Sequence, residues 1–309
     1  MEQRKAPDLN ASGLMVLFCL ILGLQQVVLK AAAEDIAPIL QIAIRSGIAA
    51  VLVWGYMRLK RERVSLGSGN WRPGLVVGLL FALEYFFLGE ALRFTSASRA
   101  VVFLYTAPVF AALILHFLIP SERMNRLQWG GVALAFLGTA LAFLGDDLGS
   151  VLSGQSDTLV GDALAMLAGA AWGATTVVIR ASRLSEVSPR ETLLYQLIMA
   201  FVLLLIGAAA TQQLGFVPSP VALASLAFQS VVVAFVAFLI WFWLLRTYHA
   251  SPIGIMSFMT PIFGVFLGAW LLSEPVEMNF LVGSLLAIAG VILISGEAQF
   301  RRLLDRALA

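Results

Sequence analysis

Ten stretches of about 20 apolar residues follow one another along this chain, with only short polar linkers between them. The hydrocarbon core of a bilayer is about 30 Å thick, and an α-helix needs roughly 20 apolar residues to cross it. Charged side chains make up 12% of the chain, which is about half their share in a soluble domain. The sequence therefore predicts an all-α integral membrane protein and excludes a cytosolic enzyme, a secreted disulfide scaffold and a disordered chain.

Ten transmembrane helices are expected over 11–32, 36–57, 73–92, 98–119, 127–145, 160–181, 189–210, 221–245, 252–273 and 279–296. With both termini cytoplasmic, sixteen of the 20 Lys and Arg residues fall on the cytoplasmic side. Positive residues are enriched on that side of a membrane protein. We therefore expect cytoplasmic tails at 1–10 and 297–309.

The second half of the chain repeats the first. The matching pairs are Leu22–Lys30 with Trp172–Arg180 (offset 150), Ala91–Ser98 with Leu244–Ser251 (offset 153), Pro108 with Pro261, and Gly131 with Gly283 (offset 152). Repeats of 11–145 and 160–296 are expected, joined by an extracytoplasmic linker at 146–159. Each repeat holds five spans, an odd number, so that the two copies enter the membrane from opposite sides. Two inverted five-helix repeats are typical of secondary transporters, although some channels also carry them.

These residues resemble the EamA-type branch of the drug/metabolite transporter superfamily. The likeness rests on Ala91–Ala100, the turn at Pro108, and Ser121–Arg123, with Thr260–Pro261 and Leu272–Glu274 in the second copy. The chain is similar to the YddG-like amino-acid exporters within that branch. The resemblance implies export of amino acids, including aromatic and neutral ones, and of related small metabolites across the bacterial inner (plasma) membrane. A multidrug or other-metabolite exporter is the alternative.

Several other classes of protein find little support in the sequence. None of its three lysines follows a phosphate-binding Gly-x-x-x-x-Gly run, and one cysteine and two histidines offer little for a metal site or a nucleophilic pair. We expect no enzyme, catalytic residue, cofactor, metal or nucleic-acid partner. The expected partners are a small-molecule substrate and the lipid bilayer, with the monomer as the functional unit. A passive channel and a non-transporting scaffold remain open.

Two charged residues fall near the middle of expected spans, where charge is costly and usually faces a cavity or the protein interior. Glu84 is the carboxylate nearest the middle of a span and would suit a proton-coupled step or a contact to a substrate amino group. Its other interpretation is a buried carboxyl group, protonated or paired with Arg45, that only packs helices. Arg45 would suit a substrate carboxylate, or would tie its helix to its neighbours.

Aromatic and polar residues inside the spans complete the predicted binding site. Tyr85, Tyr105 and Trp172 lie away from the membrane surfaces, where Tyr and Trp usually gather, and would line a cavity or form an aromatic core. Gln26 and Thr176 occupy equivalent positions of the two repeats, and Ser257 adds a hydroxyl group. Pro108 and Pro261 are equivalent helix-breaking positions. They are expected to act as hinges for alternating access, or to be static kinks.

Overall fold

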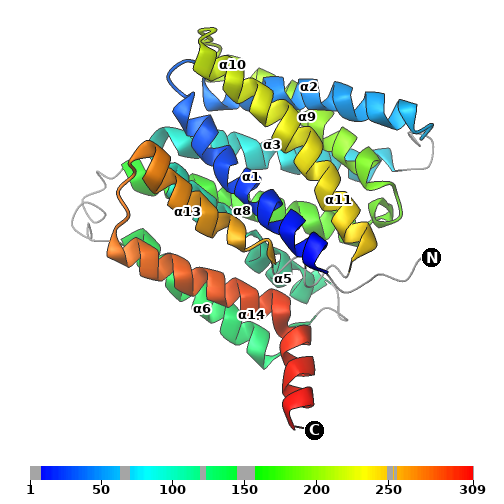
Figure 1. Cartoon of the computed structure of the whole chain (residues 1–309), viewed down its shortest axis with the longest axis vertical. Helices are drawn as coiled ribbons and strands as arrows, with labels where there is room; N and C mark the ends of the chain where they lie inside the picture. The colour runs from blue at the N-terminus through cyan, green and yellow to red at the C-terminus, as the bar shows by residue number, and fades with distance from the viewer. Residues whose placement is uncertain are drawn as a thin grey trace.

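The computed structural model describes residues 8–62, 70–118, 123–144, 157–248, 253 and 256–308. These ranges are helical apart from turns and one isolated β-bridge between Ile36 and Phe216 (Figure 1). The elements are α1 (Leu9–Ala31), α2 (Pro38–Leu59), α3 (Trp71–Phe94), α4 (Ala97–Leu104), α5 (Ala107–Leu118), α6 (Arg126–Leu144), α8 (Asp157–Ala181), η2 (Arg183–Ser185), α9 (Pro189–Ala210), α10 (Pro220–Ala227), η3 (Phe228–Ala237), α11 (Phe238–Thr247), α13 (Met259–Leu272) and α14 (Met278–Leu308).

Seven of the described helical segments are long and apolar enough to cross a membrane. They are Leu9–Ala31, Pro38–Leu59, Trp71–Phe94, Ala97–Leu118, Asp157–Ala181, Pro189–Ala210 and Pro220–Trp241. Two shorter apolar helices, Met259–Leu272 and Met278–Ile294, follow them. The all-helical membrane fold predicted from the apolar runs is therefore confirmed. The backbone of α14 runs on to Leu308, through most of the tail expected at 297–309.

Both matched prolines lie in the first turn of a helix that follows a break. α4 ends at Leu104, Tyr105 and Thr106 form a turn, and α5 begins at Ala107, one residue before Pro108. Pro261 is the third residue of α13, after a turn at Ser257 and Phe258. The first N–H groups of a helix have no partner within that helix, so proline loses nothing there.

The segment from Pro220 to Thr247 changes its winding partway. α10 passes into η3, which is wound as a π-helix over Phe228–Ala237, and then into α11. A π-helical stretch is rare and is frequently found at functional sites. Its wider winding turns Gln229 and Ser230 into the buried interior.

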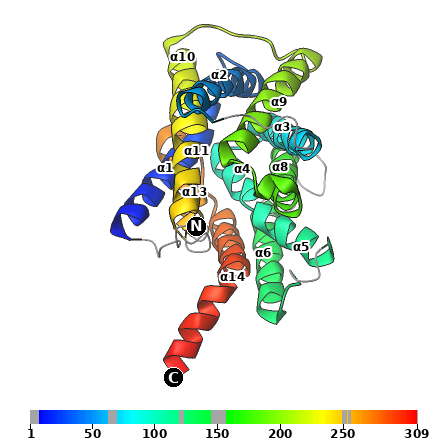
Figure 2. The same ribbon diagram turned by 90° about the vertical axis from the view of Figure 1, so that its right-hand side faces the viewer.

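α6 and α14 lie side by side along one edge of the molecule, as both views show (Figures 1 and 2). Their glycines meet in reciprocal pairs. A Cβ atom on Gly138 would lie 2.5 Å from the carbonyl oxygen of Gly283, and one on Gly283 would lie 2.5 Å from that of Gly138. Gly131 and Gly290 face each other further along. Since the residue numbers rise along one helix as they fall along the other, the two helices run antiparallel.

In two other helix pairs a glycine likewise packs directly against the backbone of the neighbouring helix. Gly23 on α1 packs against α13, where its Cβ position lies 3.0 Å from Cβ of Phe263 and 2.9 Å from the backbone nitrogen of Gly264. Gly173 on α8 packs against α5, 2.9 Å from Cβ of Phe110 and 2.9 Å from the backbone nitrogen of Ala111. Glycine is needed at both positions because a methyl group would meet backbone atoms.

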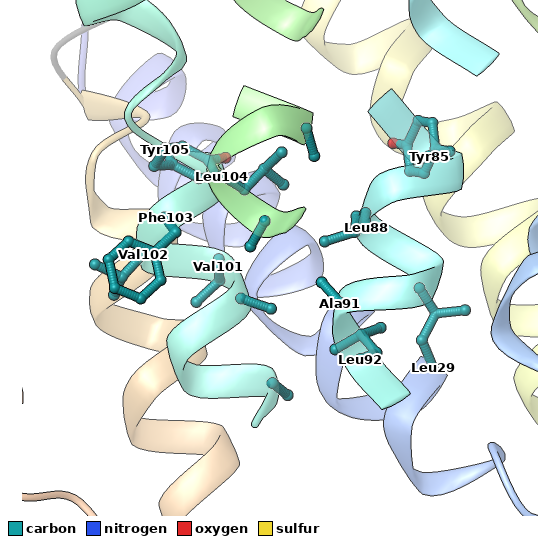
Figure 3. Packing of buried hydrophobic residues seen from close by; sticks show 14 of the residues in the cluster. Leu29, Tyr85, Leu88, Ala91, Leu92, Val101, Val102, Phe103, Leu104 and Tyr105 are labelled. Carbon is teal, nitrogen blue, oxygen red and sulfur yellow. The ribbon is translucent and has the colours of Figure 1, made fainter. Parts of the chain in front are cut away.

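A large hydrophobic cluster of the described residues draws on most helices of the bundle, with many of its members on α2, α3 and α4. Figure 3 shows part of it, where Leu88 and Leu92 on α3 and Val101 on α4 are among its fully buried members. The same buried faces of α3 and α4 carry Tyr85 and Tyr105 (Figure 3). This cluster therefore places the predicted aromatic residues in the interior of the bundle.

Candidate functional site

Buried polar side chains from several helices gather inside the bundle and form what we call the central polar cluster. Its members are Gln25 and Gln26 of α1, Arg45 of α2, Glu84 and Tyr85 of α3, Tyr105 after α4, Gln229 and Ser230 of η3, and Thr260 of α13. Each is buried to at least nine-tenths. Polar groups are costly in the interior of a membrane protein, and they commonly mark the path of a solute.

Arg45 is the largest side chain that is almost fully buried, with 1% of its surface exposed. Its Nη1 donates to Oε1 of Gln229 at 2.6 Å, and Nε2 of Gln229 donates to the backbone oxygen of Gln25 at 2.8 Å. The guanidinium carbon lies 4.4 Å from the centre of the Tyr85 ring. One amide and one aromatic face therefore hold the guanidinium group in place.

Glu84 shares this buried environment without being bonded to Arg45. Its carboxylate interacts electrostatically with Arg45 and with Tyr105. Arg45 makes its short side-chain hydrogen bond to Gln229, a neutral amide, and forms no ion pair with a carboxylate in the described part of the chain. Glu84 and Arg45 therefore interact at a longer range than a direct ion pair.

Three aromatic rings pack together within electrostatic range of Glu84. The Tyr105 and Trp172 ring centres lie 5.2 Å apart and edge to face, and the Phe258 ring lies 6.5 Å from Tyr105. Trp172 remains half-buried, whereas Tyr105 and Phe258 are buried. Tyr105 also lies next to Thr260. Aromatic walls beside a buried carboxylate suit a ligand that has both an apolar body and a charged end.

Four buried atoms of the central polar cluster have no hydrogen-bond partner within the described part of the chain. They are Oε1 of Gln26, Nε of Arg45, Oγ of Ser230 and Oγ1 of Thr260. An unsatisfied buried polar group costs about 1–3 kcal/mol, and more where it is charged. A polar solute bound among these residues would satisfy such atoms.

The remaining predicted site residues lie near this cluster or along its helices. Thr176 follows Gly169 and Trp172 on one face of α8, at helical spacing, yet it is exposed, and its hydroxyl donates to the backbone of Trp172 at 3.2 Å. Ser257 occupies the turn before α13. Pro108 and Pro261 lie just beyond the two helix breaks. No group of three or more His, Cys, Asp or Glu residues placed to hold a metal ion occurs among the described residues.

Sequence reasoning missed Gln229 and Ser230. Both lie in a long apolar run, where an isolated Gln-Ser pair gave no reason to prefer one helix face. A glutamine side chain is costly in lipid, and this cost alone could have indicated that Gln229 faces the protein interior. The π-helical winding that brings Gln229 to Arg45 has no proline or glycine within η3 to announce it.

A second polar group, here called the end cluster, joins five helices at one end of the bundle. Asp162 is fully buried and receives Nε of Arg99 at 2.9 Å and Oγ1 of Thr95 at 2.7 Å. Lys30 donates to the backbone oxygen of Thr95 at 3.0 Å. Glu274 accepts from the backbone nitrogen of Ala97 at 2.7 Å, at the start of α4. The ends of α1, α3 and α13 are thereby tied to the beginnings of α4 and α8.

The opposite end carries fewer described contacts between these helices. Asp8 caps α1 by accepting from the backbone nitrogen of Ala11 at 2.8 Å, and this bond lowers the pKa of the Asp8 carboxyl group. The hydroxyl of Tyr248 donates to Asp8 at 3.1 Å and joins α11 to α1. Thr176 is exposed at this end of α8. Gly169 and Trp172, on the same face of α8 but further from this end, pack against α4 and Tyr105.

Comparison with known proteins gives one family. The model of the EamA-like transporter family matches residues 10–144 and 159–296. A solved crystal structure superposes with a TM-score of 0.65 over 95% of this chain and 99% of that one, at 16% identity, which shows a shared fold.

Curated relatives extend over nearly the same length. Uncharacterized transporter YoaV of Bacillus subtilis is 26% identical over 89% of this chain and 92% of its own. An uncharacterized transporter of Archaeoglobus fulgidus is 25% identical over 92% and 96%. A protein of Salmonella typhimurium named as a probable amino-acid metabolite efflux pump is 24% identical over 90% and 92%.

Proposed function

Because this chain belongs to the EamA-like transporter family, we propose that it is a secondary transporter exporting amino acids and related small metabolites. The observation that carries this proposal is the central polar cluster, where Arg45 and Glu84 are buried together without forming an ion pair. The aromatic group of Tyr105, Trp172 and Phe258 lies beside it. The name of the Salmonella relative points to the same class of solute.

The proposed architecture has ten transmembrane helices in two inverted five-helix repeats, over 11–145 and 160–296. The antiparallel pairing of α6 with α14 supports it, because these helices occupy equivalent places in the repeated sequence. The matched packing of Gly23 and Gly173 supports it too, since both glycines and their partners are related by the repeat offset. An integral membrane protein of this kind would lie in the bacterial inner membrane with both termini in the cytoplasm.

Alternating access would work by opening opposite ends of the bundle in turn. In the expected orientation the end cluster lies on the outer side, where Arg99 and Asp162 tie α4 to α8. Thr176 is exposed close to the expected cytoplasmic end of α8. This asymmetry favours an inward-facing conformation, in which solute enters from the cytoplasm. Pro108 and Pro261 follow helix breaks beside the cluster and are the proposed hinges.

Counterflow in proteoliposomes tests the proposal. Vesicles are loaded in turn with unlabelled aromatic, small neutral, basic or acidic amino acids, and labelled amino acid is offered outside without an ion gradient. Saturable accumulation is expected with some loads. Glu84→Gln and Trp172→Ala are expected to reduce it at least about tenfold, whereas Arg93→Gln, which removes an exposed charge, is expected to leave it unchanged. Flat traces with every amino-acid load would contradict the proposal.

A multidrug or other-metabolite exporter is the second candidate. Glu84 beside the rings of Tyr105 and Trp172 favours it, because a carboxylate with aromatic walls also suits a lipophilic cation. The same vesicles loaded with a lipophilic cation separate the two functions. Accumulation of labelled cation, with none of amino acid, would replace the first proposal by the second.

A further inference from the structure

We propose that the central polar cluster recognises its solute by two opposite charges: Arg45, positioned by Gln229, binds a carboxylate, and Glu84 binds an ammonium group. The solute class is therefore the zwitterionic α-amino acid rather than a lone cation or anion. This inference rests on the proposed function, since it specifies the chemistry of the transported solute.

Arg45 carries the first half of the inference. Its guanidinium group offers five N–H donors, and a buried Arg is normally matched by a carboxylate. Here one of its short bonds goes to the neutral amide of Gln229, and its Nε is buried without a partner. Two parallel N–H groups of a guanidinium fit the two oxygens of a carboxylate. A solute carboxylate is the ligand that this group lacks.

Gln229 sets the orientation of that guanidinium group. Its side-chain oxygen accepts from Nη1 of Arg45, which fixes its nitrogen toward the backbone oxygen of Gln25. Both ends of the amide are thus used within the protein, and the side chain is fully buried. The Tyr85 ring covers one face of the guanidinium group at 4.4 Å. With one edge and one face held, the edge that carries Nε remains for the solute.

Glu84 carries the second half. It lies in the same buried environment and interacts with Arg45 through space, without a bond between them. A zwitterion placed at these groups would satisfy both charges at once. An amine without a carboxylate would leave Arg45 unmatched, and an acid without an amine would leave Glu84 unmatched. A site built for hydrogen bonds to a polar group strongly rejects analogues that lack it.

Competition during counterflow tests this recognition directly. The amino acid that gives the largest counterflow is compared with the amine and the acid that keep its side chain; for phenylalanine these are 2-phenylethylamine and 3-phenylpropionate. In the unaltered protein each analogue is expected to need about 10–100 times the concentration of the amino acid for half-inhibition. Equal inhibition by the amine or by the acid would overturn the inference, while the counterflow itself would still support transport.

Substitutions at Gln229 test its positioning role. Gln229→Glu would give Arg45 a carboxylate within the protein, so the preference for the amino acid over the amine is expected to fall at least about tenfold. Its preference over the acid is expected to persist, because Glu84 is untouched. Gln41→Ala is the matched control, since Gln41 is an equally buried glutamine of α2 whose amide bonds Ser225 instead. An unchanged preference in Gln229→Glu would refute the positioning role.

Ligand-induced stabilisation provides a measurement that needs no variant. The melting temperature of the purified protein is expected to rise with the amino acid and to stay unchanged with equal concentrations of the amine or the acid. A rise with the amine alone would overturn the two-charge site and favour a cation exporter. If no amino-acid load gives counterflow and no amino acid stabilises the protein, the proposed function fails and this inference fails with it.

Discussion

The glycine contact between α6 and α14 allows a quantitative test of how the two halves are joined. We consider Gly138→Ala, with Gly130→Ala on the same helix as its control. A Cβ atom on Gly138 would lie 2.5 Å from the carbonyl oxygen of Gly283 and 2.9 Å from the carbonyl carbon of Leu286. A Cβ atom on Gly130 would meet nothing within 4 Å. The two variants add the same methyl group to the same helix in opposite surroundings.

The size of the effect follows from these distances. Ordinary van der Waals contact begins at about 3.4 Å, and the backbone nitrogen of Ala287 lies closer still, so the helices would have to separate by at least about 0.9 Å at Gly138. A gap of that size forfeits a quarter to a half of the dispersion energy of the atoms involved. Overpacking of this kind costs about 1–3 kcal/mol, whereas alanine in place of an unhindered helical glycine gains about 0.5–1 kcal/mol. The gain from alanine is common to both variants, so Gly138→Ala should be less stable than Gly130→Ala by the overpacking cost alone, about 1–3 kcal/mol.

Thermal unfolding of the purified protein in detergent measures this difference. With an unfolding entropy of about 2.1 cal/mol/K per residue, 1 kcal/mol shifts the melting temperature of a chain of 309 residues by about 1.5 °C, so the two variants should differ by about 1.5–5 °C at one scan rate. Gly130→Ala should melt at or slightly above the unaltered protein. If Gly138→Ala melts as high as Gly130→Ala, the close backbone contact between α6 and α14 is not present in the protein.

Two further predictions concern other contacts within the bundle. Asp162→Asn leaves Arg99 without its carboxylate in a buried place and should destabilise the protein by about 3–5 kcal/mol in unfolding experiments, whereas Arg93→Gln, which breaks an exposed pair, should cost less than about 1 kcal/mol. Similar losses from both changes would contradict the burial of Asp162. Gly23→Ala and Gly173→Ala should both lower the melting temperature, and Gly173→Ala should lower it more, because its methyl group would lie 2.6 Å from the carbonyl oxygen of Ala107 whereas the nearest atom to that of Gly23→Ala would be at 2.9 Å. No effect from either change would argue against the close packing at that glycine.

Much of the membrane fold could be predicted because a bilayer imposes a simple requirement on helix length and polarity. The cost of charge in lipid also pointed Arg45 and Glu84 toward the interior, where the structure buries them together. The partner of Arg45 could not be predicted, since Gln229 reaches it through a π-helical segment that the sequence does not announce. The pattern of polar residues along one span indicates which side chains avoid lipid. It does not indicate which side chains of different helices contact each other.

The helix breaks were only partly predictable for a related reason. Pro108 and Pro261 marked the interrupted regions, yet the interruptions precede them, at Tyr105–Thr106 and at Ser257–Phe258. A proline is tolerated in the first turn of a helix, so it indicates where a new helix begins as readily as where one bends. Thr176 illustrates a separate limit, because its exposure depends on how far neighbouring helices extend and not on its own residue type.

The salt bridge of the end cluster has no counterpart in the other half of the chain. At the repeat offsets, Arg99 corresponds to Pro252 and Asp162 to Ser12, and neither of these residues carries a charge. If the two halves of a carrier adopt each other's conformation in turn, one end of the bundle closes with this salt bridge and the other end closes without one. The carrier's two conformations would then differ in free energy even with no solute bound. Such a molecule has a preferred resting conformation. The free energy of solute binding must then offset the difference between the two conformations before the molecule can leave it.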